Sequence, residues 1–131
     1  MKKITIHTVE DENLANKLAK TFDCLYHYDV VTCITDDAYE VFKESNNRHD
    51  DILISISMSE DNYTYLYFWE SGVNEMKLAS YLNKHILLIP NALPSSDFIS
   101  KNADAIYMKI ELGKGVSPID IAKGVYEFFE A

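Results

Sequence analysis

The stretch DILISISM, residues 51–58, decides the fold class of this sequence. It is a near-continuous apolar run, and the stretch KHILLIP at residues 84–90 is another. Such runs are typical of strands that are buried on both faces at the centre of a parallel sheet. We therefore predict two central strands here, and the other elements follow outward from them.

Three further runs rich in β-branched residues, at 3–9, 28–34 and 105–110, alternate with stretches in which apolar residues recur at helical spacing. Strands that alternate with helices predict βαβ units, whose right-handed crossovers give a parallel sheet covered on both faces. The chain of 131 residues has the length of one domain. We therefore predict a single α/β domain over residues 1–131, a three-layer sandwich around a five-stranded parallel sheet with flavodoxin-like topology.

The charge and composition exclude several classes of function. The net charge is −9, and the single arginine, Arg48, stands apart from scattered lysines, so the basic stripe of a nucleic-acid binder is missing. No segment approaches the ~20 apolar residues of a membrane span. The two cysteines, Cys24 and Cys33, fit a reducing compartment better than a disulfide framework. We predict a cytoplasmic protein that binds neither nucleic acid nor a membrane.

Sequence motifs for cofactors and metals are missing. No glycine-rich phosphate loop follows the first predicted strand, which runs into TVEDE at residues 8–12. The four histidines show no metal-ligand spacing. We predict no bound cofactor and no metal, so that NAD or another nucleotide would enter only as a substrate.

An aromatic segment follows the strand at 51–58 and therefore begins at the carboxyl edge of the predicted sheet, where ligands of open α/β sheets bind. Its aromatic residues are Tyr63, Tyr65, Tyr67, Phe68 and Trp69. The alternation of tyrosines predicts either a short extra strand or the start of a helix. The aromatic side chains could cover the sheet edge, form a stacking wall for a planar base, or bind a protein partner.

Glu75 is the first candidate for chemistry. Ser71 can cap the helix that follows the aromatic segment, which places Glu75 one turn in and Ala79 on the same helix face. A carboxylate beside an aromatic pocket is the arrangement needed to cleave an N-glycosidic bond. The alternative is a solvated carboxylate near a helix N-terminus, where its charge is mildly favourable.

The order of strand, loop, Glu75-x-x-x-Ala79 helix, basic residue and apolar strand resembles Toll/interleukin-1 receptor (TIR) domains and the nucleoside deoxyribosyltransferase group. The polar turn and helix at residues 7–19 also resemble the opening of bacterial TIR domains. This resemblance implies a TIR-like topology. It also implies that the family's catalytic glutamate falls on Glu75 and its nearby tryptophan on Trp69.

Four segments resemble those of a response-regulator receiver domain: residues 1–19, 28–42, 51–58 and 103–109. Lys109 falls at the receiver's lysine position, and the acidic residues 10–12 fall where the Mg²⁺-binding acids would lie. Ser55 occupies the position of the phospho-accepting aspartate, so neither an aspartyl phosphate nor the usual Mg²⁺ coordination is available. This resemblance implies a receiver-like module that acts by binding.

Two hypotheses of function follow. In the first, the chain binds a nucleotide or nucleoside, and Glu75 is the candidate catalytic residue for cleaving its N-glycosidic bond. Trp69 and Tyr67 would then stack on the base, and Ser57 or Ser59 would line the sugar site. In the second, a receiver-like signalling module binds a protein partner without turnover. The sequence leaves open which of the two holds, and therefore whether the chain is an enzyme, and it also leaves open whether the chain forms a homo-oligomer.

Overall fold

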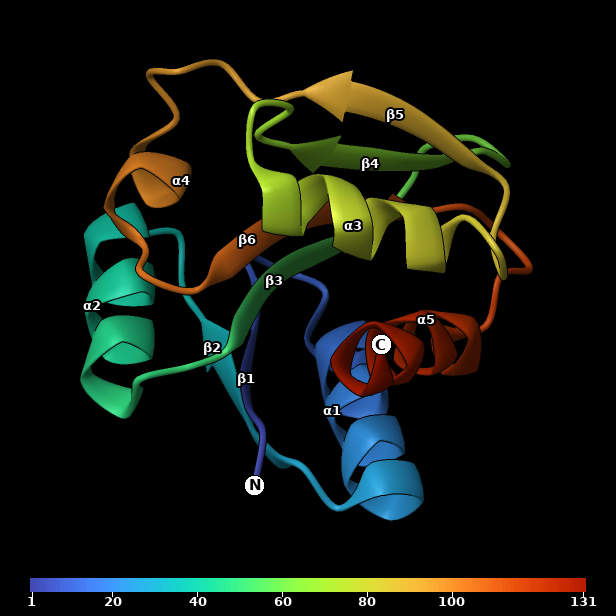
Figure 1. Cartoon of the computed structure of the whole chain (residues 1–131), viewed down its shortest axis with the longest axis horizontal. Helices are drawn as coiled ribbons and strands as arrows, with labels where there is room; N and C mark the ends of the chain where they lie inside the picture. Colours follow the sequence, from blue (N-terminus) through green and yellow to red (C-terminus); the bar gives the residue numbers. More distant parts are fainter.

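The computed structural model describes all 131 residues, and the chain forms one sheet with helices on both faces (Figure 1). The strands are β1 (Lys3–Thr8), β2 (Asp29–Ile34), β3 (Ile52–Met58), β4 (Thr64–Phe68), β5 (Leu88–Ala92) and β6 (Ile106–Leu112). The helices are α1 (Glu12–Tyr26), α2 (Ala38–Arg48), α3 (Val73–Leu82), α4 (Phe98–Asn102) and α5 (Pro118–Glu130).

The six strands lie in the order β2-β1-β3-β6-β4-β5. Neighbouring strands are parallel except for β4 and β6, which are antiparallel. The predicted α/β class is confirmed, whereas the predicted sheet of five parallel strands is wrong. An extra strand forms from the aromatic segment, and β6 inserts between β3 and β4.

The aromatic segment, whose structure the sequence left open, is β4. Thr64 and Leu66 are buried, whereas Tyr65 and Tyr67 on the opposite face are only half-buried. This alternation is typical of an antiparallel strand with one face on the core. Because β4 is antiparallel to β6, it starts beside the carboxyl end of β6 and runs toward the amino end of β6.

The predicted central strand at residues 84–90 is also wrong. Residues 84–87 belong to the turn after α3, and β5 begins at Leu88 on the outer edge of the sheet. Leu87 is 86% exposed. Pro90 lies within β5, and proline is found in sheets mainly on edge strands because it has no N–H to donate. The apolar character of this run therefore does not report a central position.

Two groups of helices cover the sheet unequally. The main core lies between the sheet and helices α1, α3 and α5, where Ile6, Ile54 and Met108 are fully buried or nearly so. A smaller cluster lies on the other face, which α2 and α4 cover. It contains Cys33, Val41, Leu53, Leu93 and Tyr107. Because α2 packs on β1 and the short α4 on β6, this face has room for a site beside the cluster.

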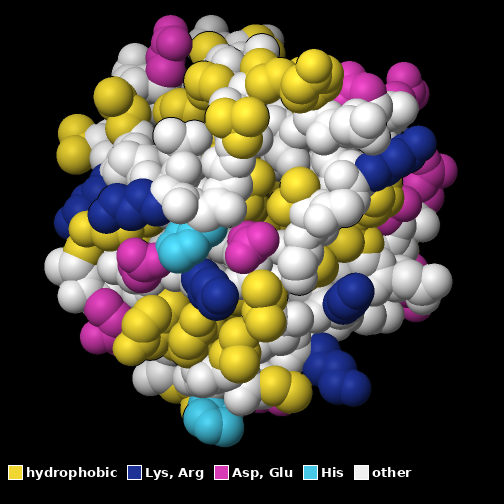
Figure 2. Space-filling model, turned by 90° about the vertical axis from the view of Figure 1, so that its right-hand side faces the viewer, with side chains coloured by type: hydrophobic (Ala, Val, Ile, Leu, Met, Phe, Trp, Pro, Cys, Tyr) yellow, Lys and Arg dark blue, Asp and Glu magenta, His cyan; other side chains and the backbone are white.

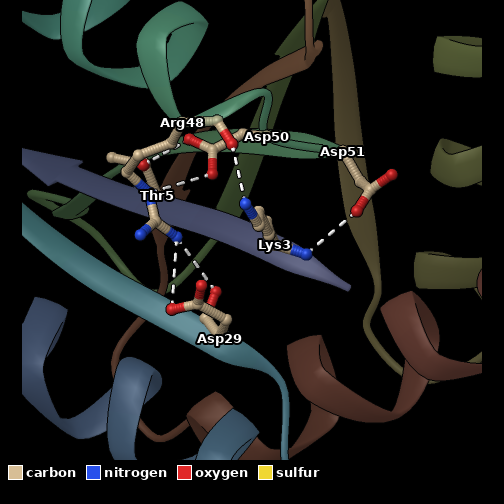
Figure 3. A network of polar contacts seen from close by, with 6 residues as sticks. All are labelled: Lys3, Thr5, Asp29, Arg48, Asp50 and Asp51. Atoms are coloured by element: carbon tan, nitrogen blue, oxygen red, sulfur yellow. Dashed lines mark hydrogen bonds and ion pairs between the residues drawn. The ribbon is translucent and has the colours of Figure 1, made fainter. Parts of the chain in front are cut away.

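A polar network closes the amino end of β1 (Figure 3). The buried Asp50 carboxylate accepts hydrogen bonds from the Thr5 hydroxyl and from Nε of Arg48, the latter at 3.2 Å. Arg48 also reaches Asp29 on β2, with an N–O distance of 3.5 Å. The network ties β1, β2 and the end of α2 together at the edge opposite the carboxyl ends of β1, β3 and β6.

The surface of the molecule is mixed in character. On the face drawn in Figure 2, acidic and basic side chains are interspersed among hydrophobic ones, as on an ordinary solvated surface. None of the helices is long and apolar enough to cross a membrane.

Candidate functional site

A cleft of about 340 Å³ opens at the carboxyl ends of β1, β3 and β6. Ligands of open α/β sheets bind along this edge, and small-molecule sites typically start at about 300 Å³. The polar residues that line the cleft include His7, Glu10, Ser55, Ser57, Asp97, Tyr107, Lys109 and Glu111. The cleft is therefore a candidate site, because it lies at the ligand-binding edge of the sheet and is lined by many polar groups.

The strand register places these side chains in two adjacent rows on one face of the sheet. Register partners in neighbouring strands point to the same face, so each row crosses several strands. The first row, from β1 to β4, is His7, Ser55, Lys109 and Tyr67. The second row, from β3 to β4, is Ser57, Glu111 and Tyr65. The cleft and the half-buried tyrosines of β4 thus form one continuous polar face.

A directed hydrogen-bond chain forms the floor of the cleft. Nε2 of His7 lies 2.9 Å from the carbonyl oxygen of Thr35, which can only accept, so Nε2 carries the proton. Nδ1 then accepts the Ser55 hydroxyl at 2.7 Å, and the Tyr107 hydroxyl donates to Ser55 Oγ at 2.8 Å. All these groups are paired, which fixes the floor in one arrangement.

Burial controls the protonation of this floor. Burial lowers the pKa of His7 and the positive charge of Lys109 adds to this effect, while the hydrogen bond to Thr35 opposes it. Burial also raises the pKa of Tyr107 to about 12. Neutral histidine and neutral tyrosine are the forms that the observed hydrogen bonds require.

We expect His7 to make the protein less stable in mild acid. Its folded pKa is below the ordinary value of 6.5, so as the pH falls through that value the unfolded chain binds a proton that the folded chain does not. Stability is therefore lost as the pH drops from about 7.5 to 5.5. Urea unfolding at both pH values should show a smaller loss for His7→Gln than for the wild type. The exposed His49, replaced by asparagine, is the control, and equal losses for wild type and His7→Gln would contradict this assignment.

Lys109 is the only basic lysine or arginine side chain in the cleft. It is exposed and forms no ion pair, and its ammonium group lies 5.4 Å from the ring centroid of Tyr67. The acidic groups around it are already engaged in part. Asp97 accepts from the Ser100 backbone N–H at 2.9 Å, and Glu111 accepts from the Tyr67 hydroxyl at 2.7 Å. Lys109 is therefore a free cation that faces the ligand space of an otherwise acidic molecule.

Glu75, the predicted catalytic residue, lies away from the cleft. It sits in the first turn of α3, on the sheet face opposite the cleft, and its carboxylate folds back against Gly72. The cap residue of this helix is Gly72, so the predicted cap at Ser71 is wrong. Glu75 does not line the cleft, and it has no aromatic wall beside it there.

The other predicted site residues are dispersed. Trp69 is 52% exposed and lines a separate hollow with Pro94 and Lys101. Ser57 does line the cleft. Tyr67 lies beside the cleft, where its hydroxyl donates to the lining residue Glu111. Ser59 is buried and its hydroxyl donates to Asp61 at 3.0 Å, outside the cleft lining.

The donor set of the chain does not fit a metal ion. Nowhere do three or more His, Cys, Asp or Glu side chains come together in a geometry that could hold one. Both ring nitrogens of His7, the cleft's only imidazole, are already used by Thr35 and Ser55. The residues of this chain therefore do not form a metal centre.

The sequence does not predict His7 or Glu111 as cleft residues, and it points to Lys109 only through the resemblance to receiver domains. Their signal was present in the period of two within the strands, as in Tyr107, Lys109 and Glu111 along β6. Polar residues at alternate positions of one strand share one face of the sheet, and the register decides which residues of neighbouring strands lie beside them. That pattern identifies the cleft once the strand order is known.

Three solved structures that share this fold are two N-acetylmuramoyl-L-alanine amidases and the catalytic domain of an endolysin. The catalytic domain of the N-acetylmuramoyl-L-alanine amidase CwlV from Bacillus (Paenibacillus) polymyxa var. colistinus aligns with a TM-score of 0.71 at 12% identity, covering 99% of each chain. The N-acetylmuramoyl-L-alanine amidase from Clostridium difficile 630 aligns with a TM-score of 0.67 at 13% identity, covering 98% of this chain and 95% of the amidase chain. The catalytic domain of the CD27L endolysin, which targets Clostridia difficile, aligns with a TM-score of 0.67 at 17% identity. The alignment covers 98% of this chain and 96% of the endolysin domain.

This chain therefore has the fold of N-acetylmuramoyl-L-alanine amidase catalytic domains, and at these identities the likeness shows the fold alone. No protein-family model matches the sequence, and no curated protein matches it.

These structures correct the predicted family. The resemblances to TIR domains, deoxyribosyltransferases and receiver domains are wrong, because the structures named above, which share the fold along nearly the whole chain, are two amidases and an endolysin catalytic domain. The predicted nucleotide or nucleoside ligand, the N-glycosidase activity of Glu75 and the receiver-like signalling role depended on those resemblances. None of the three is retained.

Proposed function

We propose that this chain binds a peptidoglycan fragment that contains the N-acetylmuramoyl–L-alanine linkage, and that it holds this linkage in the cleft without hydrolysing it. One observation carries the proposal. The cleft lies at the carboxyl edge of an amidase-like fold and offers polar binding groups, but the chain has no set of metal ligands.

Two common routes to amide hydrolysis are poorly supplied here, which supports binding without hydrolysis. These routes use water activated on a metal ion, or a side-chain nucleophile activated by a base. The donor set does not fit a metal. The one hydroxyl bonded to an imidazole, that of Ser55, belongs to a side chain that is only 6% exposed, and its oxygen already accepts the Tyr107 hydroxyl.

The binding roles follow from charge and hydrogen-bonding capacity. Lys109 pairs with the carboxylate of the alanine, because it is the free cation of the cleft. Glu111 accepts the N–H of the linkage through the oxygen that Tyr67 leaves free. Ser57, beside Glu111 in the same row, supplies a further hydroxyl. The ligand is thus recognised by a charged end and an adjacent amide.

Replacing Lys109 by alanine should weaken the binding of N-acetylmuramoyl-L-alanine about tenfold or more, because a hydrogen bond to a charged group is lost. Isothermal titration calorimetry on the wild type, Lys109→Ala and Lys109→Arg measures this, with Lys123→Ala on α5 as the matched lysine control. Lys109→Arg should keep most of the affinity.

The same ligand, incubated with the protein with and without added Zn²⁺, tests for cleavage. Mass spectrometry should detect no free L-alanine. Release of L-alanine by the wild type would overturn the non-hydrolytic role, and absence of binding would overturn the whole proposal.

The hydrogen bond from Ser55 to His7 favours a second candidate function, a metal-independent hydrolase with Ser55 as nucleophile. This candidate differs from the first in a measurable way. It requires turnover that persists in a chelator and disappears in Ser55→Ala.

We also propose the cytoplasm as the location, as the reduced cysteines suggest. Cys24 and Cys33 are both free, and they lie in different environments, one exposed and one buried. In that compartment the ligand would be a soluble fragment of peptidoglycan.

A further inference from the structure

Strand β4 carries two half-buried tyrosines, Tyr65 and Tyr67, on the same sheet face as the cleft. The helices of this face pack mainly on β1 and β6, so the tyrosines lie at the side of the sheet beyond that cover. Half-buried aromatic side chains of this kind combine an apolar face with a polar tip. Nothing in the binding roles assigned to Lys109 and Glu111 explains them.

The two tyrosines continue the cleft directly. In the antiparallel pairing of β4 and β6, Tyr67 is the register partner of Lys109 and Tyr65 that of Glu111. Directly opposed residues in such a pair have their Cβ atoms about 5 Å apart. A ligand whose amide lies at Glu111 therefore has its next group over β4.

Hydrogen bonds hold both rings in place. The Tyr67 hydroxyl donates to Glu111 at 2.7 Å, and the Tyr65 hydroxyl donates to Asp61 at 2.6 Å. These bonds raise the pKa of Tyr67 and raise that of Tyr65 to about 12, so both phenols stay protonated. Each carboxylate keeps lone pairs that can accept further hydrogen bonds.

We infer that Tyr65 and Tyr67 form a sugar-binding strip, which takes the pyranose ring of the bound fragment. This inference rests on the proposed function and adds the part of the ligand that the cleft leaves unassigned. A pyranose ring presents C–H groups to an aromatic surface and hydroxyl donors to the carboxylates of Glu111 and Asp61. Those two negative charges oppose phosphate groups, so a neutral sugar fits the strip better than a nucleotide does.

The test compares two ligands that differ only in the sugar. N-acetylmuramoyl-L-alanine contains the ring, whereas N-lactoyl-L-alanine keeps the amide and the carboxylate without it. The wild type should bind the first about tenfold or more tightly than the second, because only the first buries apolar area on the tyrosines. Tyr67→Ala should remove most of this difference, because it takes away aromatic surface that only N-acetylmuramoyl-L-alanine contacts.

Two further variants separate the ring from the hydroxyl. Tyr67→Phe keeps the aromatic surface and should keep most of the preference for the sugar, while Tyr126→Ala on the opposite face is the matched control and should change nothing. Equal affinity of the wild type for both ligands would overturn the strip and leave the proposed function intact. An equal loss for both ligands in Tyr67→Ala would show that Tyr67 acts only through Glu111, which also overturns the strip. Binding of neither ligand by the wild type would overturn both proposals.

Discussion

Replacing Arg48 by alanine should lower the free energy of unfolding by about 3–5 kcal/mol, because it leaves a buried carboxylate without its cation. The side chain of Asp50 is fully buried, and Nε of Arg48 donates to it at 3.2 Å. The Thr5 hydroxyl is its other partner. Figure 3 shows how these side chains converge at the amino end of β1. A hydroxyl alone does not compensate a buried negative charge.

Chemical denaturation monitored by circular dichroism measures this loss. Asp29→Asn is the control, because it removes an ion pair of the same arginine at a partner that is 39% exposed, and should cost at most about 1 kcal/mol. A loss below about 1 kcal/mol for Arg48→Ala would contradict the dependence of Asp50 on its cation.

Leu53→Ala should destabilise the protein by about 2–5 kcal/mol, whereas Leu87→Ala should change its stability by less than about 0.5 kcal/mol. Leu53 is fully buried in the small cluster under α2, where it packs near Tyr107 beneath the cleft floor. Leu87 is 86% exposed, just before the edge strand β5. The two substitutions remove the same atoms from the two environments.

Thermal and urea unfolding of both variants checks this prediction. A cost for Leu87→Ala as large as that of a core leucine would show that residues 84–90 lie in a central strand after all. Because Tyr107 also lines the cleft, Leu53→Ala should in addition weaken ligand binding, and Leu87→Ala should not.

The sequence allowed the α/β class to be predicted, because hydrophobic periodicity reports which faces are buried. It did not report the order of the strands. The run at 51–58 is interior, as predicted, and forms β3, but the equally apolar run at 84–90 ends in a turn and an edge strand. The two runs differ in what packs around them, and that is decided by long-range pairing that a local pattern does not contain.

The residues of the candidate site were likewise predicted only in part. Ser57 and Tyr67 were named from the sequence and lie in or beside the cleft, because both belong to strands that reach its edge. The prediction of Glu75 depends on its spacing to an aromatic segment that would lead into α3 at the carboxyl edge. The antiparallel run of β4 carries the chain away from that edge before α3 begins, so Glu75 lies outside the cleft, whose carboxylates include Glu111 of β6.

Pro90 has a consequence for self-association. A second copy that extended the sheet at β5 would need every outward backbone donor of this strand, and a proline has none to offer. Growth of a continuous sheet from copy to copy is therefore blocked at this margin, even though hydrophobic side chains such as Leu87 lie exposed beside it. A dimer that extends the sheet must therefore do so at the other edge strand, β2.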